Sequence, residues 1–177
     1  MKRHLPFALV LGLVLVGSVF TGVALAADYN GKGYFPTNNL TYCQAGSYLL
    51  PNRAAIAKWS STTDINLTQN CTTTHVRSQT WNWENNGYYG YAYICMTNGA
   101  CDTFPLDSTY KSCKAESNTY YLDSWNDTQR QFNMTHELGH CWSLGHRDAD
   151  ATSVMQRGKL SIIEPNARDK ELVNNRY

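Results

Sequence analysis

The first strongly patterned stretch of the chain is a nearly unbroken apolar run over residues 5–23. Two basic residues, Lys2 and Arg3, precede the run, and the small-x-small sequence Ala24-Leu25-Ala26 follows it. A positive start, an apolar middle and a small-residue cleavage site are typical of a secretory signal peptide. The pattern predicts a signal peptide over residues 1–26 and a secreted, extracellular chain. An uncleaved membrane anchor is the alternative, because the run is almost long enough to cross a bilayer.

Beyond this run the hydrophobic positions become sparse and their spacing changes along the chain. Residues 27–50 are polar, rich in Gly, Asn and Tyr, and lack a sustained period, which predicts an irregular N-terminal arm. Residues 52–60 carry apolar side chains at helical spacing and predict a short helix. Residues 64–67 and 72–80 alternate and contain many β-branched side chains, which favours two strands.

The middle of the chain contains an alternating aromatic pattern. Tyr89, Tyr91 and Tyr93 alternate with small or aliphatic residues and predict a strand with one aromatic face. Such a face could stack on sugar rings, but ordinary packing of tyrosine rings on neighbouring strands is the favoured interpretation. Residues 98–114 are expected to form a long loop, and residues 119–122 a short strand.

The clearest helical pattern begins near Asp127, where Thr128 and Gln131 have the spacing of a capping box. Apolar side chains then recur on one face, which would bury that face against a sheet. They are Phe132, Met134, Leu138, Cys141 and Trp142. A last helix is expected over residues 166–176, after Pro165.

Length and charge limit the possible partners of this chain. Removing 26 of the 177 residues leaves 151, which suits one domain with one core, expected over residues 51–177. Loss of Lys2 and Arg3 leaves 13 basic residues against 14 acidic ones, a net charge of about −1. This balance argues against nucleic acid, and against stable membrane association once the signal peptide is removed. We expect a monomer.

All six cysteines follow the predicted cleavage site, at positions 43, 71, 95, 101, 113 and 141. An even number in an exported chain predicts disulfides, although six cysteines allow 15 pairings. Cys95 and Cys101 bracket a turn-like Asn98-Gly99 and are the first pair expected. Cys141 could instead bind a metal. It directly follows His140, however, and would point away from that side chain's helix face, which favours packing or a disulfide.

Metal-binding chemistry is concentrated in the stretch from His136 to His146. His136 and His140 are four residues apart, so that on a helix both imidazoles lie on one face and can reach one zinc ion. Glu137 is offset around the helix, towards a water on the metal. A break near Ser143–Gly145 would deliver His146 as a third ligand. Three protein ligands leave the fourth tetrahedral position open, as in catalytic zinc sites.

This stretch resembles the signature of the metzincin metalloproteases, H-E-x-x-H-x-x-G-x-x-H followed by a Met-turn. Residues 153–156, with Met155, resemble the Met-turn, and the run from residue 165 to 177 resembles the C-terminal helix of the matrixin-like branch. The resemblance covers residues 129–177 well and extends more loosely back to Ala54. One position departs from it, because Ser143 replaces the signature glycine. Either Ser143 adopts a left-handed conformation, at a cost of about 1–2 kcal/mol, or the turn shifts to Gly145.

The resemblance implies an α+β fold of the α/β/α-like metzincin type. A twisted mixed sheet would pack on the active-site helix, and a small C-terminal subdomain after His146 would carry the Met-turn and a final helix. The strand expected at 119–122 would be the sheet edge to which an extended protein or peptide substrate adds. Met155 would form an apolar floor beneath the metal. Asp169 would point inward and hydrogen-bond the Met-turn backbone; a solvent-facing carboxylate is the equal alternative.

The sequence therefore predicts a secreted endopeptidase with one catalytic Zn²⁺ held by His136, His140 and His146, and with Glu137 as general base. A catalytically weak or inactive binding module on the same scaffold is the first alternative. A structural domain stabilised by zinc is the second, and would need a fourth ligand such as Cys141 or Asp148. Calcium is possible at Asp102 and Asp107, although such residues are more often simply solvated.

Overall fold

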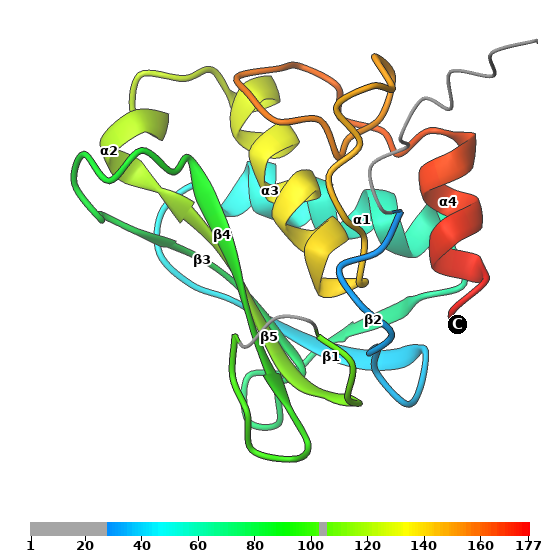
Figure 1. Cartoon of the computed structure of the whole chain (residues 1–177). Helices are drawn as coiled ribbons and strands as arrows, with labels where there is room; N and C mark the ends of the chain where they lie inside the picture. The colour runs from blue at the N-terminus through cyan, green and yellow to red at the C-terminus, as the bar shows by residue number, and fades with distance from the viewer. Residues whose placement is uncertain (1–27, 103–105) are drawn as a thin grey trace, which may run out of the picture.

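The computed structural model describes residues 28–102 and 106–177, so the predicted signal peptide at 1–26 lies outside the described residues. The strands are β1 (Asn39–Gln44), β2 (Asn66–Gln69), β3 (Val76–Trp81), β4 (Gly90–Met96) and β5 (Tyr110–Asn118). The helices are α1 (Leu49–Thr62), α2 (Thr119–Leu122), α3 (Asp127–Cys141) and α4 (Ala167–Asn174). Helices α1, α3 and α4 lie together on one side of the sheet (Figure 1). None of the helices in the described ranges is long and apolar enough to cross a membrane.

The five strands form one mixed sheet in the order β2-β1-β3-β5-β4. The pairs β1–β2, β1–β3 and β3–β5 are parallel, whereas the edge strand β4 is antiparallel to β5. Neighbouring parallel strands need a crossover connection, which α1 supplies between β1 and β2. The predicted mixed α+β architecture is confirmed.

The hydrophobic core lies between the sheet and helices α1 and α3. Fully buried side chains come from both helices and from the inner face of the sheet, and each of the larger aliphatic ones contributes about 1.5–3 kcal/mol by leaving water. They include Trp59, Val76, Ile94, Ala115, Met134 and Leu138. The indole nitrogen of Trp59 donates a hydrogen bond to the carbonyl oxygen of Thr135 at 3.0 Å. This contact joins α1 directly to the helix that carries the paired histidines.

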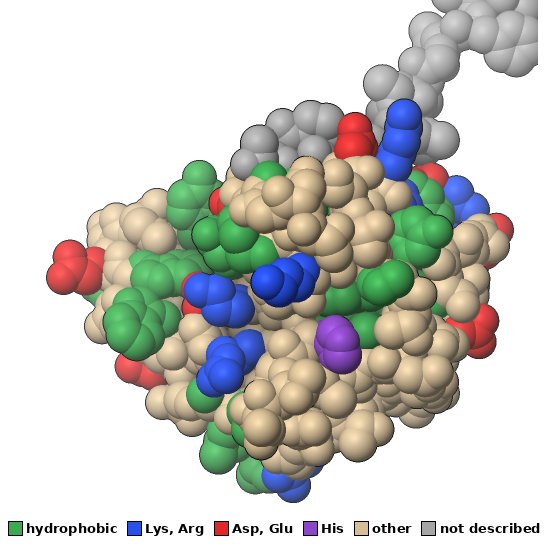
Figure 2. Space-filling model, turned by 90° about the horizontal axis from the view of Figure 1, so that it is seen from below, with side chains coloured by type: hydrophobic (Ala, Val, Ile, Leu, Met, Phe, Trp, Pro, Cys, Tyr) green, Lys and Arg blue, Asp and Glu red, His purple; other side chains and the backbone are tan. Residues whose placement is uncertain are grey.

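The opposite face of the sheet carries polar and aromatic side chains. Arg77, Lys114 and Tyr93 lie side by side on β3, β5 and β4, and the Lys114 ammonium is 4.6 Å from the Tyr93 ring centroid. The Tyr91 hydroxyl donates to Asp102. Figure 2 shows basic side chains close to hydrophobic ones on the side that the helices leave uncovered. The tyrosines predicted to form an aromatic face are thus in contact with partners from the chain itself.

Three disulfides link the six cysteines, as Cys43–Cys71, Cys95–Cys101 and Cys113–Cys141. The predicted Cys95–Cys101 pair is confirmed, and so is the expectation that Cys141 forms a disulfide. The Cys113–Cys141 bond ties the end of α3 to β5, which fixes the helix against the sheet. Three disulfides in a chain of this size are typical of an oxidising compartment.

The N-terminal arm, predicted to be irregular over residues 27–50, contains strand β1 and the first residues of α1. Within β1 the fully buried positions are Leu40 and Cys43, three residues apart, so the strand does not show an alternating pattern. Pairing with β2 and β3, rather than local sequence, makes it a strand. The loop predicted over 98–114 is also shorter than expected, because β5 begins at Tyr110.

The short strand predicted at residues 119–122 is wrong, because these residues form helix α2. The preceding strand β5 ends at Asn118, whose side-chain oxygen accepts a hydrogen bond from Tyr120 N at 3.2 Å and caps the helix. Residues 119–122 are therefore not the sheet edge. The two edge strands are β2 and β4.

Helix α3 begins at Asp127, as predicted, but its N-cap lies two residues before the predicted Thr128. Its N-cap is Asn126, whose side chain accepts from Gln129 N at 3.0 Å, while the Gln129 side chain accepts from Asn126 N at 3.2 Å. The capping box is therefore Asn126 with Gln129, and not Thr128 with Gln131. Both pairs have the required spacing, and Asn is as good an N-cap as Thr or better, so the sequence does not discriminate between them.

Candidate metal centre

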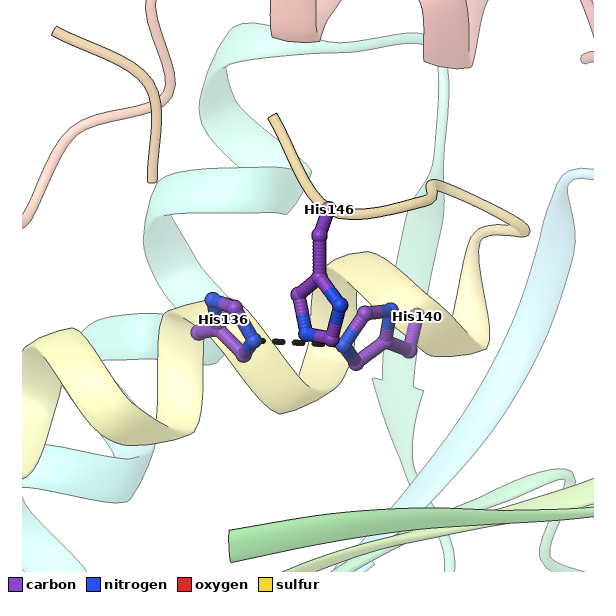
Figure 3. A group of neighbouring side chains, drawn as sticks. All are labelled: His136, His140 and His146. Atoms are coloured by element: carbon purple, nitrogen blue, oxygen red, sulfur yellow. Dashed lines mark hydrogen bonds between the residues drawn. The ribbon is translucent and has the colours of Figure 1, made fainter. Parts of the chain in front are cut away.

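Helix α3 presents His136 and His140 one turn apart on its cleft-facing side (Figure 3). Their Nε2 atoms are 3.2 Å apart, and their ring centroids are 4.7 Å apart. Two nitrogens that each lie about 2.0–2.1 Å from one tetrahedral ion are separated by about 3.4 Å. The spacing between the two nitrogens therefore fits one shared ion.

A tight turn at the end of α3 reverses the chain. Ser143 has a φ of 77°, so the position at which the family signature has glycine does adopt the left-handed conformation. Ser143 N donates to His140 O at 2.9 Å, and Leu144 N donates to Gly139 O at 3.0 Å. The Tyr110 hydroxyl, from β5, donates to Ser143 Oγ at 3.3 Å. The alternative, a turn made by Gly145, is not observed.

This turn places His146 beside the two helical histidines. Its ring centroid is 4.8 Å from that of His140 and 5.2 Å from that of His136. One ligand nitrogen from each histidine lies within 4.8 Å of the other two. Figure 3 shows the His146 ring reaching down from its loop towards the other two rings. A small movement of the His146 ring would bring all three nitrogens within reach of one ion.

Backbone carbonyl groups orient the two helical imidazoles. His136 Nδ1 lies 2.9 Å from Val154 O, and His140 Nδ1 lies 2.7 Å from Leu144 O. A carbonyl oxygen can only accept, so each Nδ1 carries the proton and each Nε2 keeps its lone pair. Ligand histidines in proteins are commonly fixed by a second hydrogen bond of this kind.

Burial keeps the three imidazoles neutral. It lowers the pKa of His136 to about 4, with a further contribution from the nearby His146. Burial and the two neighbouring histidines hold the pKa of His140 well below its usual range, and burial also lowers the pKa of His146. Since a metal binds the neutral imidazole, these residues have the protonation state that a ligand set requires at neutral pH.

Glu137 is buried beside the histidines. It forms no hydrogen bond or ion pair with any residue in the described ranges, and burial raises the pKa of its carboxyl well above the usual value. Gly90, the first residue of β4, passes so close that a Cβ there would be 2.5 Å from Glu137 Oε1. Glycine at this position therefore leaves room for the carboxylate.

The segment predicted to be a Met-turn packs beneath the histidines. Met155 is fully buried, and its sulfur lies against Gly139 of α3, where any larger side chain would collide with it. Asp169 is also fully buried and accepts hydrogen bonds from Val154 N at 3.0 Å and from Ser153 Oγ at 2.7 Å. The Asp169 carboxylate therefore points inward and does not face solvent.

The N-terminal residues of the described chain also contact the metal centre, which sequence reasoning missed. Asn30 N donates to Ser143 O at 2.9 Å, and Gly145 N donates to Asp28 O at 3.0 Å. The Asn30 amide nitrogen lies 3.1 Å from His140 Nδ1. These residues belong to a polar segment without a pattern, and more than 100 positions separate them from the residues that they contact. No local signal in the sequence therefore points to their role.

A cleft of about 460 Å³ opens over the three histidines. It is lined by β4 and the turn before it, and by residues 156–158. Helix α3 forms the floor, from Phe132 at one end to His140 at the other. Because these two residues are eight positions apart, the cleft is a groove that follows α3 for about 12 Å, and the three histidines line part of it.

Among the described residues, no fourth protein ligand accompanies the histidines. In the part of the chain that the structure describes, the three histidines alone form a group able to hold a metal ion. The sulfur of Cys141 is bonded to that of Cys113, and Asp148 accepts hydrogen bonds from Arg157. The ligand set is therefore open, and the alternative of a closed structural zinc site has no support from these residues.

The two acidic residues considered for calcium have other contacts. Asp102 accepts a hydrogen bond from the Tyr91 hydroxyl, and Asp107 accepts one from Lys32 N at 2.9 Å. Neither belongs to a metal-binding group among residues 28–102 and 106–177.

No family model matches this sequence, and no curated protein matches it. Among solved structures, the chain is similar to myroilysin, with a TM-score of 0.56 and 13% identity over 81% of this chain and 82% of that one. It is also similar to a chain of the ECX AB5 holotoxin in its GM1-bound form, with a TM-score of 0.55 and 14% identity over 86% of each chain. At these identities the similarity shows a shared fold.

Proposed function

We propose that this chain is a secreted zinc-dependent endopeptidase of the metzincin type, related to the matrixin-like branch. One observation carries the proposal: His136, His140 and His146 converge in an open groove, and no other residue in the described ranges joins them as a fourth ligand. The protease-like fold that the chain shares with myroilysin also supports it. The three disulfides and the predicted signal peptide support secretion.

The donor set suits zinc. Burial keeps the three imidazoles neutral, and backbone carbonyl oxygens hold the proton of two of them, His136 and His140, on Nδ1. The three rings can therefore offer three nitrogen ligands. When bound there, a zinc ion would acidify a water molecule and polarise a peptide carbonyl.

Glu137 is the proposed general base. Its carboxylate adjoins the ligand group and has no competing partner among the described residues, and its raised pKa brings it closer to neutrality. A group that takes a proton from water and then passes it to the leaving amine works best when its pKa lies near the working pH. Met155 beneath α3 and Asp169 behind the Met-turn hold this arrangement without touching the substrate.

The substrate is proposed to be an extended protein or peptide segment that pairs with β4. Ile94 O accepts a hydrogen bond from Asp102 N, on the side of β4 away from β5. Backbone groups two residues apart in a strand point the same way, so those of Ala92 and Gly90 also face outward. No described residue pairs with them, and both residues line the groove. They can therefore bind another strand by main-chain hydrogen bonds.

The experiment that tests this function uses purified full-length protein and an unfolded protein substrate. We expect cleavage that a chelator abolishes and added zinc restores. Glu137→Ala should keep its zinc and lose turnover by about 10²- to 10⁴-fold, because proton transfer by a positioned side chain contributes that much. Glu171→Ala, which removes an exposed carboxylate on α4, is the matched control. A Glu137→Ala protein that binds zinc and cleaves as fast as the native one would refute the proposed base.

A protein that binds zinc at the three histidines and hydrolyses no peptide bond would instead support the binding-module alternative. Mass spectrometry of the digest, together with metal analysis of the same sample, separates these two results.

A further inference from the structure

Asn133 is a buried amide one turn before the metal-binding group. It lies on α3, three residues before His136 and four before Glu137, and only 4% of its surface is exposed. Its Oδ1 accepts a hydrogen bond from Ser117 Oγ at 2.7 Å. Ser117 is fully buried on β5, so the amide is held by a fixed donor and its orientation is determined.

The amide nitrogen of Asn133 is free to bind a ligand. It donates to no residue in the described ranges, and it is not fully enclosed by the protein. Asn133 lines the groove over the histidines. Because its oxygen faces Ser117, its nitrogen faces the groove, where an N–H donor without an acceptor costs free energy until a ligand or water accepts from it.

The surroundings of Asn133 define one end of the groove. At the far end of the groove, Asn30 contacts His140. Asn133 lies on the other side of His136, about 4.5 Å from it along the axis of α3. Tyr89 and Phe132 line the groove at this end and supply apolar surface. A side chain of a few carbon atoms, entering from a peptide bound over the histidines, would reach the Asn133 amide.

Two basic side chains lie near the groove. Arg157 lines the groove, although Asp148 pairs with it. Lys159 lies close by, with its ammonium 5.3 Å from the ring centroid of Trp125, whose ring is 4.8 Å from that of Tyr89. Lys159 has no ion-pair partner in the described part of the chain. An N–H donor and an unpaired cation both favour an oxygen acceptor.

We infer that this end of the groove selects a substrate side chain that ends in a carbonyl or carboxylate oxygen, as Gln and Glu do. The oxygen accepts from Asn133 Nδ2, and the methylene groups pack on Tyr89 and Phe132. The inference rests on the proposed endopeptidase function and specifies the substrate that it takes. Discrimination by one such hydrogen bond is worth about tenfold in rate.

The test compares peptides that differ at one residue. A peptide that the native protein cleaves is varied in turn at each position around the cut, with Gln, Glu, Met and Leu. Met is close to Gln in length and shape but lacks the amide. The Gln-to-Met ratio of kcat/KM therefore measures the contribution of the hydrogen bond to the amide oxygen. At one position we expect native protein to prefer Gln and Glu over Met by about tenfold.

Three variants assign the effect to Asn133. In Asn133→Leu, which keeps the volume and removes the donor, the Gln-to-Met ratio should fall to about one. Asn133→Asp places a negative charge there and should select against Glu specifically. Ser117→Ala frees the amide to rotate and should reduce the ratio. Ser78→Ala removes another fully buried hydroxyl, on β3, and is the control in which the native ratio should persist.

The outcomes separate this inference from the proposed function. Cleavage with equal rates for Gln and Met at every position would overturn the inference and leave the endopeptidase standing. If no peptide is cleaved, the same peptides are titrated into the zinc-loaded native protein by calorimetry. Equal affinities for the Gln and Met forms in that titration would overturn the inference, and tighter binding of the Gln form that Asn133→Leu abolishes would support it.

Discussion

The two halves of the candidate metal centre are held in place by different forces. His136 and His140 come from a regular helix that is packed in the hydrophobic core, whereas His146 comes from an irregular segment. The helix is anchored by buried apolar side chains, a capping box and the Cys113–Cys141 disulfide.

The irregular segment is anchored by polar contacts. Arg147, next to His146, forms ion pairs with Asp169 at 3.0 Å, Asp150 at 3.1 Å and Asp28 at 3.6 Å. Asp169 in turn holds Ser153 and Val154, and Val154 O orients His136. The comparison teaches that the position of His146 depends on a partly buried ionic network, because the segment that carries it has no regular structure of its own.

The largest effect is expected from Asp169→Ala. Arg147 is only 13% exposed, and the substitution removes one of its three ion pairs and leaves Val154 N and Ser153 Oγ without their acceptor. Breaking such a buried pair should lower the free energy of unfolding by about 3–5 kcal/mol. Urea denaturation checks this, with Asp127→Ala, which breaks an exposed ion pair on α3, as the control that should lose less than about 1 kcal/mol. Equal losses for both variants would contradict the comparison.

Removal of the Cys113–Cys141 disulfide tests the helical half. The bond spans 28 residues, so replacing both cysteines by Ala should destabilise the protein by about 3–4 kcal/mol through the entropy of the unfolded chain. The Cys95–Cys101 pair spans only 6 residues, and its removal should cost about 2 kcal/mol. The two double variants are compared by thermal and urea unfolding. A larger loss for the shorter loop would mean that chain entropy is not the main contribution.

Acidification should destabilise the metal-free protein through the buried histidines. The pKa of His136 is about 4 in the folded protein and about 6.5 in the unfolded chain, so the unfolded chain binds more protons as the pH falls below 6.5. Stability from this group is complete above pH 6.5 and is lost as the pH falls towards 4. Between pH 7.5 and 5 the loss from His136 alone is about 2 kcal/mol. Urea unfolding of the chelator-treated protein measures it, and His136→Gln should show a smaller loss.

Zinc affinity should decline over the same pH range, because protons and metal compete for the neutral imidazoles. A competition assay with a chromophoric chelator at pH 7.5 and pH 5.5 follows this decline. An affinity independent of pH would argue against histidine ligands.

The smallest effect concerns the turn between the two halves. Ser143→Gly relieves about 1–2 kcal/mol of strain at positive φ but loses the hydrogen bond from Tyr110, so the net change should stay below about 1 kcal/mol. Ser143→Ala keeps the strain and loses the bond, and should be less stable than Ser143→Gly by about 1 kcal/mol. Denaturation midpoints of the two variants give the difference. A more stable Ala variant would show that the strain at this position is negligible.

The candidate metal site and some structural features of this protein can be predicted from local sequence. The spacing of His136 and His140 forces both imidazoles onto one face of any helix that contains them, and Glu137 necessarily lies beside them. The alternating tyrosines predict the strand that became β4, and the even number of cysteines predicts disulfides. Each of these inferences depends on residues that are neighbours in the chain, for which the geometry of a helix or strand is enough.

Other features were decided only by the tertiary structure. β1 is a strand because β2 and β3 pair with it, residues 119–122 are a helix because Asn118 caps them, and Ser143 takes the left-handed turn because its neighbours hold it there. The hydrogen bonds of Asn30 with Ser143 and of Ser117 with Asn133 join residues that are 16 or more positions apart in the sequence. Their free energy arises only when the core and the ionic network bring distant segments together, so no local pattern in the sequence records them.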